Sequence, residues 1–252
     1  MEVKQSIKEF YNQQAEKFSN TRKKHWPEFD YIANEIEEVL QKKDKVKILE
    51  LGCGDWRFFR FLKEKFGDQI EYLWVDISEK LVEIAQKQGG NFVVSDMLEF
   101  LEKQDYQVYD VVVAIASFQH IPTKWERLLI LKHIYRVLTY GWKLVMVNWS
   151  FSSWFFKKYK FQILKSFVIW ILSLWGKPIN DFYIPWKDKW KVFYRYYHIF
   201  FIFELKKLLK LAWFVIKEIC YIWKDGQKTI NWANSRNSFV VWEKEVVYKG
   251  DN

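Results

Sequence analysis

Short apolar runs alternate with amphipathic segments along the first part of the chain. Five of these runs have the length and composition of buried strands: 46–51, 70–75, 91–95, 109–115 and 143–149. Segments with apolar residues at helical spacing lie around them: 4–18, 30–43, 57–65, 78–87 and 124–138. Because strands that alternate with helices form parallel sheets covered on both faces, the pattern predicts a Rossmann-like, doubly wound α/β fold.

The later part of the chain departs from this alternation. Residues 151–200 are rich in aromatic and basic side chains, and a helix at 204–212 follows. Two further strands, 214–223 and 237–246, are expected to complete the sheet as an antiparallel pair. We therefore predict a mostly parallel sheet of seven strands in one domain, residues 1–252. Its parts are an N-terminal helical segment, a ligand-binding core, an aromatic and basic lid or cap, and a C-terminal helix with strands: 1–45, 46–149, 150–203 and 204–252.

The charge and the cysteine content of the chain indicate which partners and which metal sites to expect. The 252 residues carry 40 basic and 31 acidic side chains, and the net charge of +9 favours nucleic acid, an acidic small molecule or a membrane surface. Half of the residues are hydrophobic, which argues against disorder. Two cysteines build neither a zinc cluster nor a disulfide framework, so no metal site is expected. The most apolar stretch, 166–175, is too short to span a bilayer, and the N-terminus is unlike a signal peptide, so we expect a cytoplasmic location.

A glycine turn follows the first predicted strand, in the sequence Glu50-Leu51-Gly52-Cys53-Gly54. Glycine lets the backbone bend sharply and approach a ligand closely, and open α/β sheets bind ligands at the carboxyl ends of their strands. A dinucleotide fingerprint would have a third glycine where Arg57 stands, which weighs against binding of NAD. The alternative is an ordinary tight turn from strand to helix.

Carboxylates stand at the ends of the next two strands. Asp76 could accept hydrogen bonds from the ribose hydroxyls of a nucleoside. Asp96 could bind an adenine amino group while Met97 packs on the ring. Each aspartate alone is as often a helix cap or a turn residue. The glycine turn, Asp76 and Asp96 nevertheless follow three successive strands, and this combination favours a nucleoside ligand.

These residues resemble the class I S-adenosylmethionine-dependent methyltransferases, of the methyltransferase type 11 domain group. The matching segments lie in the core, at 48–54, 75–78, 95–97, 109–112 and 136–141. The resemblance implies S-adenosylmethionine as cofactor and 46–149 as the cofactor-binding core. It implies these contacts: Glu50, Gly52 and Gly54 at the methionine part, Asp76 at the ribose, Asp96 at the adenine, Ala116 on the floor, and Cys53, Ile77 and Met97 beside them.

A narrower resemblance, to the tRNA wobble-uridine carboxymethyl methyltransferases, lies mostly outside this core. It rests on short matches in 11–12, 15, 18–22, 26–27, 116–121, 195–198 and 204–205. It implies tRNA as partner and methyl esterification of a carboxymethyl group. A carboxylate is ionised at neutral pH, so this reaction needs orientation and cations rather than a general base. The substrate-positioning candidates are Arg22, His120, Arg195 and His198, with Arg236 as a further cation.

Structural explanations compete with these assignments. A lone histidine in a loop is often satisfied by its neighbours, and Arg195 could simply pack on the aromatic residues beside it. The function is open as well: a small-molecule methyltransferase acting on a carboxylate, quinone or lipid precursor is one alternative, for which 151–200 would be a lid. A non-catalytic protein of the same fold that binds RNA or a partner is another. A membrane-surface role for 160–176 is a further hypothesis.

Tryptophan is unusually frequent here, with 15 residues against nine glycines. Trp56, Trp74, Trp142 and Trp213 stand where the resembled family usually has glycine or another small residue. We expect these sites to require a positive φ or the absence of a Cβ, so that tryptophan strains the turn or fills the cofactor pocket. One hypothesis is that UGA codons read as glycine in the organism have been translated as tryptophan.

Overall fold

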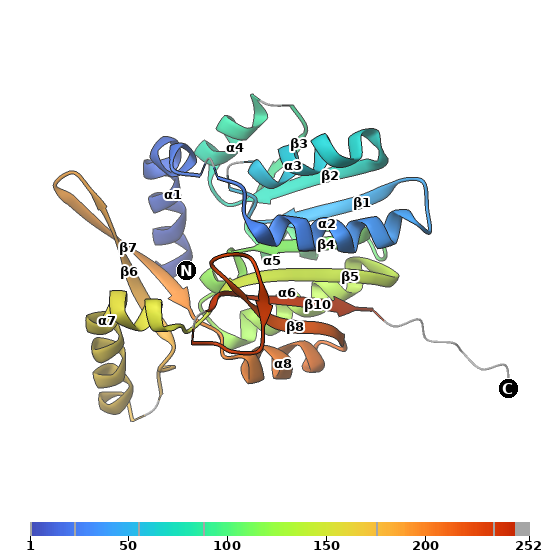
Figure 1. Cartoon of the computed structure of the whole chain (residues 1–252). Coiled ribbons are helices and arrows are strands. Elements are labelled where there is room, and N and C mark those ends of the chain that lie inside the picture. The colour runs from blue at the N-terminus through green and yellow to red at the C-terminus, as the bar shows by residue number, and fades with distance from the viewer. Residues whose placement is uncertain are drawn as a thin grey trace, which may run out of the picture.

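The computed structural model describes residues 2–22, 24–54, 56–87, 89–174, 176–233 and 235–244. Its centre is an eight-stranded sheet in the order β3-β2-β1-β4-β5-β10-β8-β9 (Figure 1). The strands are β1 (Val46–Leu51), β2 (Ile70–Asp76), β3 (Asn91–Val94), β4 (Tyr109–Ile115), β5 (Leu138–Trp149), β8 (Val215–Trp223), β9 (Lys228–Thr229) and β10 (Ser235–Glu243). Strands β1 to β5 are parallel, and β10 lies antiparallel between β5 and β8.

This arrangement confirms the predicted doubly wound, mostly parallel α/β sheet with an antiparallel C-terminal pair. The count of seven strands was wrong, because β8 turns at Gly226 and pairs with the short edge strand β9. Gly226 has a φ of +93°, a conformation that glycine adopts without strain. The last strand ends at Glu243, and the predicted strand positions 245 and 246 lie outside the described residues.

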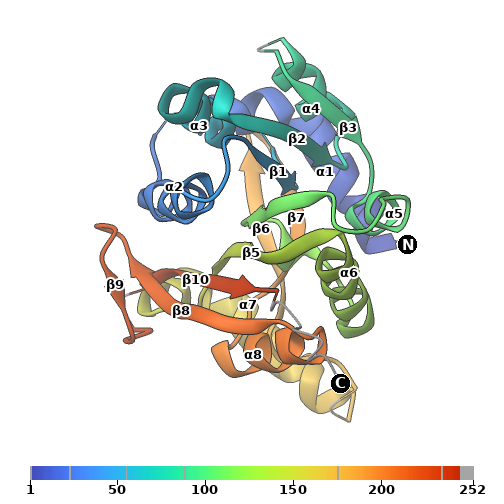
Figure 2. The same cartoon turned by 90° about the vertical axis from the view of Figure 1, so that its right-hand side faces the viewer.

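Helices cover both faces of the sheet (Figure 2). They are α2 (Pro27–Leu40), α3 (Arg57–Phe66), α4 (Glu79–Gln86), α5 (Met97–Glu102), α6 (Lys124–Val137) and α8 (Ile202–Leu211), with short 3₁₀ turns η1 (Gly67–Gln69) and η2 (Phe118–His120). On one face Ile36 of α2 and Leu62 of α3 share a core cluster with Ile48 of β1. On the other face Ile134 of α6 and Leu208 of α8 belong to a second cluster. The sheet is thus buried on both sides, which explains why its strands read as continuous apolar runs.

Residues 151–200, expected as a lid or cap, form a helix and a separate two-stranded sheet. Helix α7 (Ser153–Leu172) precedes the antiparallel hairpin of β6 (Asp181–Asp188) and β7 (Lys191–His198). Phe155 and Tyr159 of α7 pack with Phe182 and Ile184 of β6 in a third core cluster. Helix α1 (Glu2–Asn20) packs against α4 and β7, so α1, α7 and the hairpin lie together beyond the carboxyl ends of the parallel strands (Figure 1).

The four tryptophans at expected glycine sites fall into two pairs. Trp56 (φ 64°) and Trp213 (φ 66°) have a left-handed backbone, as predicted. Trp74 lies inside β2, fully buried, with its ring centroid 3.8 Å from that of Phe92. Trp142 lies inside β5. For Trp74 and Trp142 the expectation of a glycine-like backbone was wrong, because extended strand backbone accepts bulky aromatic residues readily.

Candidate active site

A cavity of about 1100 Å³ lies between the carboxyl ends of the parallel strands and a cap that consists of α1, α7 and the hairpin of β6 and β7. Glu50 near the end of β1, Asp76 at the end of β2, Asp96 after β3 and Ala116 after β4 all line it. The other residues expected to contact a cofactor line it too: Gly52, Cys53, Gly54, Ile77 and Met97. The structure therefore brings together at one cavity all nine residues that the sequence assigned to cofactor binding.

The glycine turn after β1 forms one wall of this cavity. Gly52 (φ +76°) and Gly54 (φ +61°) both have a left-handed backbone. The Gly52 N–H donates to the Val75 carbonyl at 2.7 Å, which holds the turn against β2. A Cβ on Gly52 would lie 2.3 Å from the Cβ of Ser117, so this position accommodates no side chain. The turn therefore presents backbone, rather than side chains, to the cavity.

Two buried carboxylates flank the turn. Asp76 accepts the Gly54 and Ser78 backbone N–H groups, each at 2.9 Å. Burial raises the pKa of Asp76 above its ordinary value, although these N–H groups act in the opposite direction. Glu50 is buried and accepts a hydrogen bond from the Tyr72 hydroxyl at 2.9 Å. Burial together with the Glu50 charge places the pKa of Tyr72 well above its ordinary value, so Tyr72 stays a donor.

Asp96 has the structural role that the sequence left open. One of its carboxylate oxygens caps α5 by accepting the Leu98 N–H at 2.9 Å, and the other lies 3.0 Å from the Lys4 ammonium. Its side chain nevertheless borders the cavity beside Met97. The adenine contact of Asp96 therefore stays a prediction alongside its observed role as helix cap.

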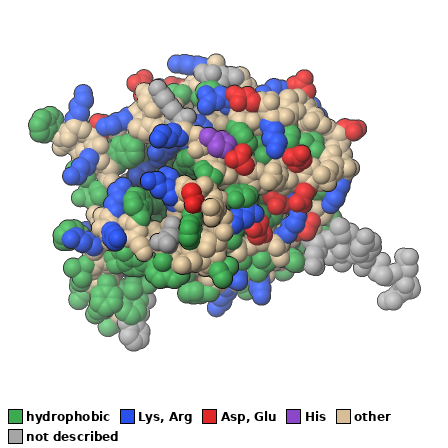
Figure 3. All heavy atoms as spheres, viewed as in Figure 1, with side chains coloured by type: hydrophobic (Ala, Val, Ile, Leu, Met, Phe, Trp, Pro, Cys, Tyr) green, Lys and Arg blue, Asp and Glu red, His purple; other side chains and the backbone are tan. Residues whose placement is uncertain are grey.

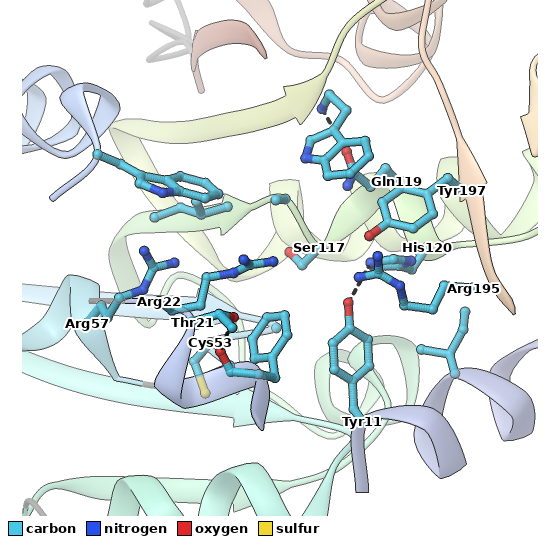
Figure 4. A pocket seen from close by; sticks show the side chains of 18 of the residues that line it. Tyr11, Thr21, Arg22, Cys53, Arg57, Ser117, Gln119, His120, Arg195 and Tyr197 are labelled. Atoms are coloured by element: carbon cyan, nitrogen blue, oxygen red, sulfur yellow. Dashed lines mark hydrogen bonds between the residues drawn. The ribbon is translucent and has the colours of Figure 1, made fainter. Parts of the chain in front are cut away.

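Cationic and aromatic side chains gather at the opposite end of the cavity. Figure 4 shows the Arg22 side chain directed toward His120 and Arg195, with Tyr11 and Tyr197 beside them. Burial lowers the pKa of Arg22, and the positive charges of Arg57 and Arg195 lower it further. Among the described residues, nine lysines and arginines line the cavity: Lys4, Arg22, Lys24, Arg57, Lys158, Lys187, Arg195, Lys224 and Arg236.

Arg195 is buried among aromatic rings. Its exposed fraction is 4%, and its guanidinium carbon lies 5.0 Å from the ring centroid of Phe10, 4.9 Å from that of Trp186 and 5.2 Å from that of Tyr197. Although burial acts in the opposite direction, the nearby Tyr197 and Tyr11 side chains act to raise the pKa of Arg195. Among the described residues it has no carboxylate partner, and its Nε atom has no hydrogen-bond partner. The packing expected as the structural alternative is therefore present, and the surroundings raise the pKa of Arg195, so the guanidinium stays charged.

His120 connects Arg195 to the η2 turn. Burial lowers the pKa of His120 to about 4, with a further contribution from the Arg195 charge, so the imidazole is neutral at physiological pH. Its Nδ1 lies 2.7 Å from the Tyr196 carbonyl oxygen, which can only accept, so Nδ1 carries the proton. Its Nε2 then accepts from the Tyr11 hydroxyl at 3.1 Å. The tautomer of His120 is thus set by its neighbours.

His198 does not lie at the cavity. It is the last residue of β7 and is buried. Its Nδ1 faces the Asp181 carboxylate at 2.5 Å, and its Nε2 faces the Glu204 carboxylate at 2.8 Å. Burial acts to raise the pKa of Glu204, but the hydrogen bond and charge of His198 outweigh it and the pKa is lowered. The structure therefore groups Arg22, His120 and Arg195 and places His198 in a separate cluster that joins β6 and β7 to α8.

Comparison with known proteins relates this chain to methyltransferases. Residues 48–141 match the sequence profile of a methyltransferase domain family. The chain is 28% identical over 179 residues to the probable tRNA methyltransferase 9B of Bos taurus, covering 71% of this chain and 36% of that protein. It is 24% identical over 147 residues to the tRNA (carboxymethyluridine(34)-5-O)-methyltransferase of Arabidopsis thaliana, covering 58% of this chain and 33% of that protein. The chain thus spans about a third of the length of these two relatives.

Relatives of other kinds and solved structures agree. The malonyl-[acyl-carrier protein] O-methyltransferase 1 of Ilyobacter polytropus is 28% identical over 132 residues, covering 50% of this chain and 46% of that protein. A SAM-dependent methyltransferase from Methanosarcina mazei superimposes with a TM-score of 0.64 at 20% identity, covering 82% and 97% of the two chains. The 1,6-didemethyltoxoflavin-N1-methyltransferase of Burkholderia thailandensis, with bound S-adenosylhomocysteine, gives 0.63 at 13%, covering 97% and 90%. Residues 48–141 therefore match a methyltransferase domain, and the fold is that of these solved methyltransferases.

The residues of this methyltransferase domain fit S-adenosylmethionine. Gly52 packs too closely against Ser117 to carry a side chain, so its backbone itself borders the cavity. Glu50 would face the ammonium of the methionine part, and Asp76 retains carboxylate lone pairs for ribose hydroxyls. Trp56, expected to fill this pocket, is not among the described residues that line it, and its ring lies 4.9 Å from the Arg60 guanidinium carbon. Of the two expected effects of Trp56, the positive φ of the turn is found, whereas its ring does not line the cavity.

Helix α1 and the hairpin contribute lining residues that the sequence did not assign to the site. Lys4, Ile7, Tyr11 and Phe18 all line the cavity and follow one stripe of α1 at helical spacing. Tyr11 and Phe18 belong to the segments that resemble the tRNA methyltransferases, but nothing in the sequence marked Lys4 or Ile7 as part of a ligand site rather than a packing face. Trp186 also lines the cavity, and its buried Nε1 has no hydrogen-bond partner among the described residues.

Proposed function

We propose that this methyltransferase esterifies a carboxylate, and that the acceptor is a carboxymethyl group on the wobble uridine of tRNA. The observation that carries the proposal is the buried guanidinium of Arg195, which borders the cavity without a carboxylate partner among the described residues. An anionic acceptor would supply the carboxylate partner that this guanidinium does not have among the described residues, through charge-assisted hydrogen bonds. The names of two relatives point the same way, since carboxymethyluridine and malonyl groups both carry a carboxyl group.

The expected reaction relies on orientation. When bound, S-adenosylmethionine supplies an electrophilic methyl group. The acceptor oxygen of a carboxylate is already ionised at neutral pH, so no residue has to remove a proton. Arg195 and Arg22 would bind the carboxylate, and the unpartnered Trp186 N–H is a further donor. Proximity and alignment then account for most of the acceleration.

In this scheme His120 is a positioning residue. Its lone pair at Nε2 accepts from Tyr11, and the Tyr11 oxygen in turn meets the Arg195 guanidinium. The chain of hydrogen bonds starts at the Tyr196 carbonyl, on the strand that also carries Arg195. His120 therefore fixes the direction of the guanidinium, and its neutral form is the one that does so. A tRNA acceptor also agrees with the cytoplasmic location expected from the sequence.

Methyl transfer to defined tRNA tests the proposal. The protein is incubated with labelled S-adenosylmethionine and either tRNA bearing a carboxymethyl wobble uridine or the matched unmodified transcript. We expect base-labile label in the first only. Arg195→Lys, which loses the planar guanidinium, should lower kcat/KM for this tRNA about 10- to 100-fold while the cofactor Kd changes less than about twofold. Arg60→Lys, outside the lining, is the matched control. Equal label in the unmodified transcript, or label in neither, contradicts the proposal.

A small carboxylate acceptor is the second candidate. The relative from Ilyobacter polytropus is named for a malonyl group on a carrier protein, and the aromatic cap suits an apolar chain as well as a base. Label in a malonyl thioester and none in either tRNA would transfer the acceptor assignment to this class. Loss of that label in Arg195→Lys would show that the guanidinium serves a carboxylate in either case.

A further inference from the structure

Helix α7 has one anchored side and one apolar side open to solvent. Phe155 and Tyr159 are buried on the anchored side, and the Ser166 hydroxyl lies 2.9 Å from the carbonyl oxygens of both Ile179 and Asp181. The other side carries large exposed side chains that we call the α7 face: Phe161, Leu164, Phe167, Val168, Ile169, Ile171, Leu172 and Leu174. The exposed fractions of Phe161 (72%), Leu164 (59%) and Leu172 (77%) show that nothing in the described fold covers them.

The α7 face is continuous. Phe161, Leu164, Val168, Ile171 and Leu172 recur at helical spacing, so they form one stripe along the helix. Contiguous exposed apolar surface of this kind marks a binding surface rather than scattered surface residues. Figure 3 shows hydrophobic side chains gathered at the lower left, where Figure 1 places α7.

The charged side chains that α7 itself carries are all positive. Lys157, Lys160 and Lys165 stand on the helix and Lys177 follows it, whereas the chain has no aspartate or glutamate from 127 to 180. Lys165 lies one turn from Phe161 and from Val168, within the apolar stripe itself. Long lysine side chains in such a place can lie along apolar surface while the ammonium reaches a polar layer. The fitting partner is therefore apolar inside and negatively charged at its surface.

We infer that the α7 face docks onto an anionic lipid membrane, with α7 lying in the plane of the interface. Lipid bilayers with anionic headgroups present acyl chains below a negatively charged layer, which matches aliphatic side chains bordered by lysines. A second copy of this chain would place lysines against lysines on a molecule of net charge +9. Nucleic acid matches the lysines but not the leucine, isoleucine and valine side chains, which do not stack with bases. No described helix is long and apolar enough to cross the membrane, so the contact is peripheral.

Docking of the α7 face has a consequence for the cavity. The first half of α7 contributes Trp154, Lys158, Tyr159 and Gln162 to the lining of the acceptor end. The same helix therefore carries the cavity wall in its first half and the membrane contact in its second half. Membrane binding would place the acceptor end of the cavity beside the lipid headgroups.

Vesicle flotation with the full chain tests this inference. We expect binding to vesicles of phosphatidylcholine with phosphatidylglycerol, and much weaker binding to phosphatidylcholine alone. Leu164→Glu/Leu172→Glu should lower the affinity for anionic vesicles at least about tenfold. Lys165→Glu/Lys177→Glu should lower it by a similar factor of about ten on anionic vesicles only. All four side chains are exposed, and circular dichroism verifies that the variants fold.

A matched control lies at the other end of the sheet. Tyr106 is 73% exposed just before β4, away from the cap, so Tyr106→Glu should leave vesicle binding within about twofold. Three results would overturn the inference. One is absence of wild-type binding to either vesicle, and another is equal binding by all variants. The third is a dimer or a tRNA complex that Leu164→Glu/Leu172→Glu abolishes while vesicle binding persists.

Discussion

His120 is a buried imidazole whose two ring nitrogens are both engaged, one as donor and one as acceptor. Its pKa of about 4 lies below the ordinary value of 6.5, because burial penalises the charged form. The unfolded chain therefore binds a proton at this site between pH 6.5 and pH 4, where the folded chain does not. Its contribution to stability is complete above pH 6.5 and is lost as the pH falls through this window.

This sign gives a testable pH dependence. The free energy of unfolding should fall by up to about 3 kcal/mol between pH 6.5 and pH 4 because of His120 alone. His120→Gln, which retains an acceptor for Tyr11, should show a correspondingly shallower slope. Chemical denaturation of both proteins at several pH values measures the difference. Parallel slopes would mean that the imidazole is not held neutral by its burial.

Trp56 and Trp213 offer a second test at the scale of single residues. Their left-handed backbones cost about 1 kcal/mol each for a non-glycine residue, so Trp56→Gly and Trp213→Gly should each raise the free energy of unfolding by about that amount. Trp125 lies at an exposed helical site in α6, so Trp125→Gly should lower the free energy of unfolding by about 1 kcal/mol. Denaturant melts compare them. Destabilisation by all three would show that the rings of Trp56 and Trp213 outweigh the strain.

The gene sequence bears on the same two positions. Left-handed backbone supports glycine as the natural residue at 56 and 213, which predicts UGA codons there. Trp74 fills a packed site against Phe92, so the structure does not require glycine at 74. UGG codons at 56 and 213 would end the codon hypothesis.

Single residues were predictable where the backbone alone decides their place. Glu50, Asp76 and Ala116 reach the cavity because the carboxyl ends of parallel strands must share one edge of the sheet. His198 was not predictable in this way, because its surroundings are set by long-range contacts with Asp181 and Glu204. Sequence shows that a histidine follows Tyr197 but not which carboxylates will meet it.

Helices and strands, too, were predictable where local sequence decides them and not where long-range contacts do. The core strands were predicted within a few residues, since burial on both faces leaves a clear apolar run. The hairpin of β6 and β7 was missed because Pro185 interrupts β6 and the tight turn has Lys189 at φ 49°, where glycine or asparagine would give a signal. Helix α7 was hard to assign because many of its apolar residues face solvent, so their pattern does not report burial.

Asp181, His198 and Glu204 form a cluster of hydrogen bonds that connects the hairpin to α8, which we call the joint. Glu204 has a lowered pKa, so its contribution is present above its ordinary value of 4.5 and is lost as the pH falls below it. We expect Glu204→Gln to lower the free energy of unfolding at neutral pH by about 2 kcal/mol and to speed proteolysis of the hairpin. Glu99→Gln, which removes an exposed pair with Lys103, should change it by less than about 0.5 kcal/mol. Equal effects would argue against a buried joint.

At the scale of the whole molecule, charge is sorted along the cavity. Glu50, Asp76 and Asp96 line it from the ends of the parallel strands, whereas Lys158, Lys187 and Arg195 line it from α7 and the hairpin. Lys187 and Lys224 are exposed at this lining, and neither has an ion-pair partner among the described residues. A polyanion that reaches the acceptor end would therefore contact cations on both the hairpin and the loop after β8.

This arrangement predicts how the proposed methylation of tRNA depends on salt concentration. Each phosphate that a lysine neutralises releases about one counterion, so log(kcat/KM) should fall linearly with log of the salt concentration. Lys187→Ala/Lys224→Ala should reduce the magnitude of that slope by about 2, since each substitution removes about one phosphate-binding ammonium. The cofactor Kd should show little of this dependence, because the carboxylate end of the cavity binds no phosphate chain. Steady-state kinetics over a salt series measure both quantities.

A second double variant with the same net charge as Lys187→Ala/Lys224→Ala serves as the control. Lys80→Ala/Lys103→Ala removes two exposed lysines paired with Glu83 and Glu99, away from the cavity. If net charge alone attracted tRNA, both double variants would change the slope equally. If tRNA contacts the cavity rim, only Lys187→Ala/Lys224→Ala will flatten it, and a small carboxylate acceptor will show a weak slope with every protein. A strong slope for the small acceptor would instead indicate long-range steering by the whole molecule.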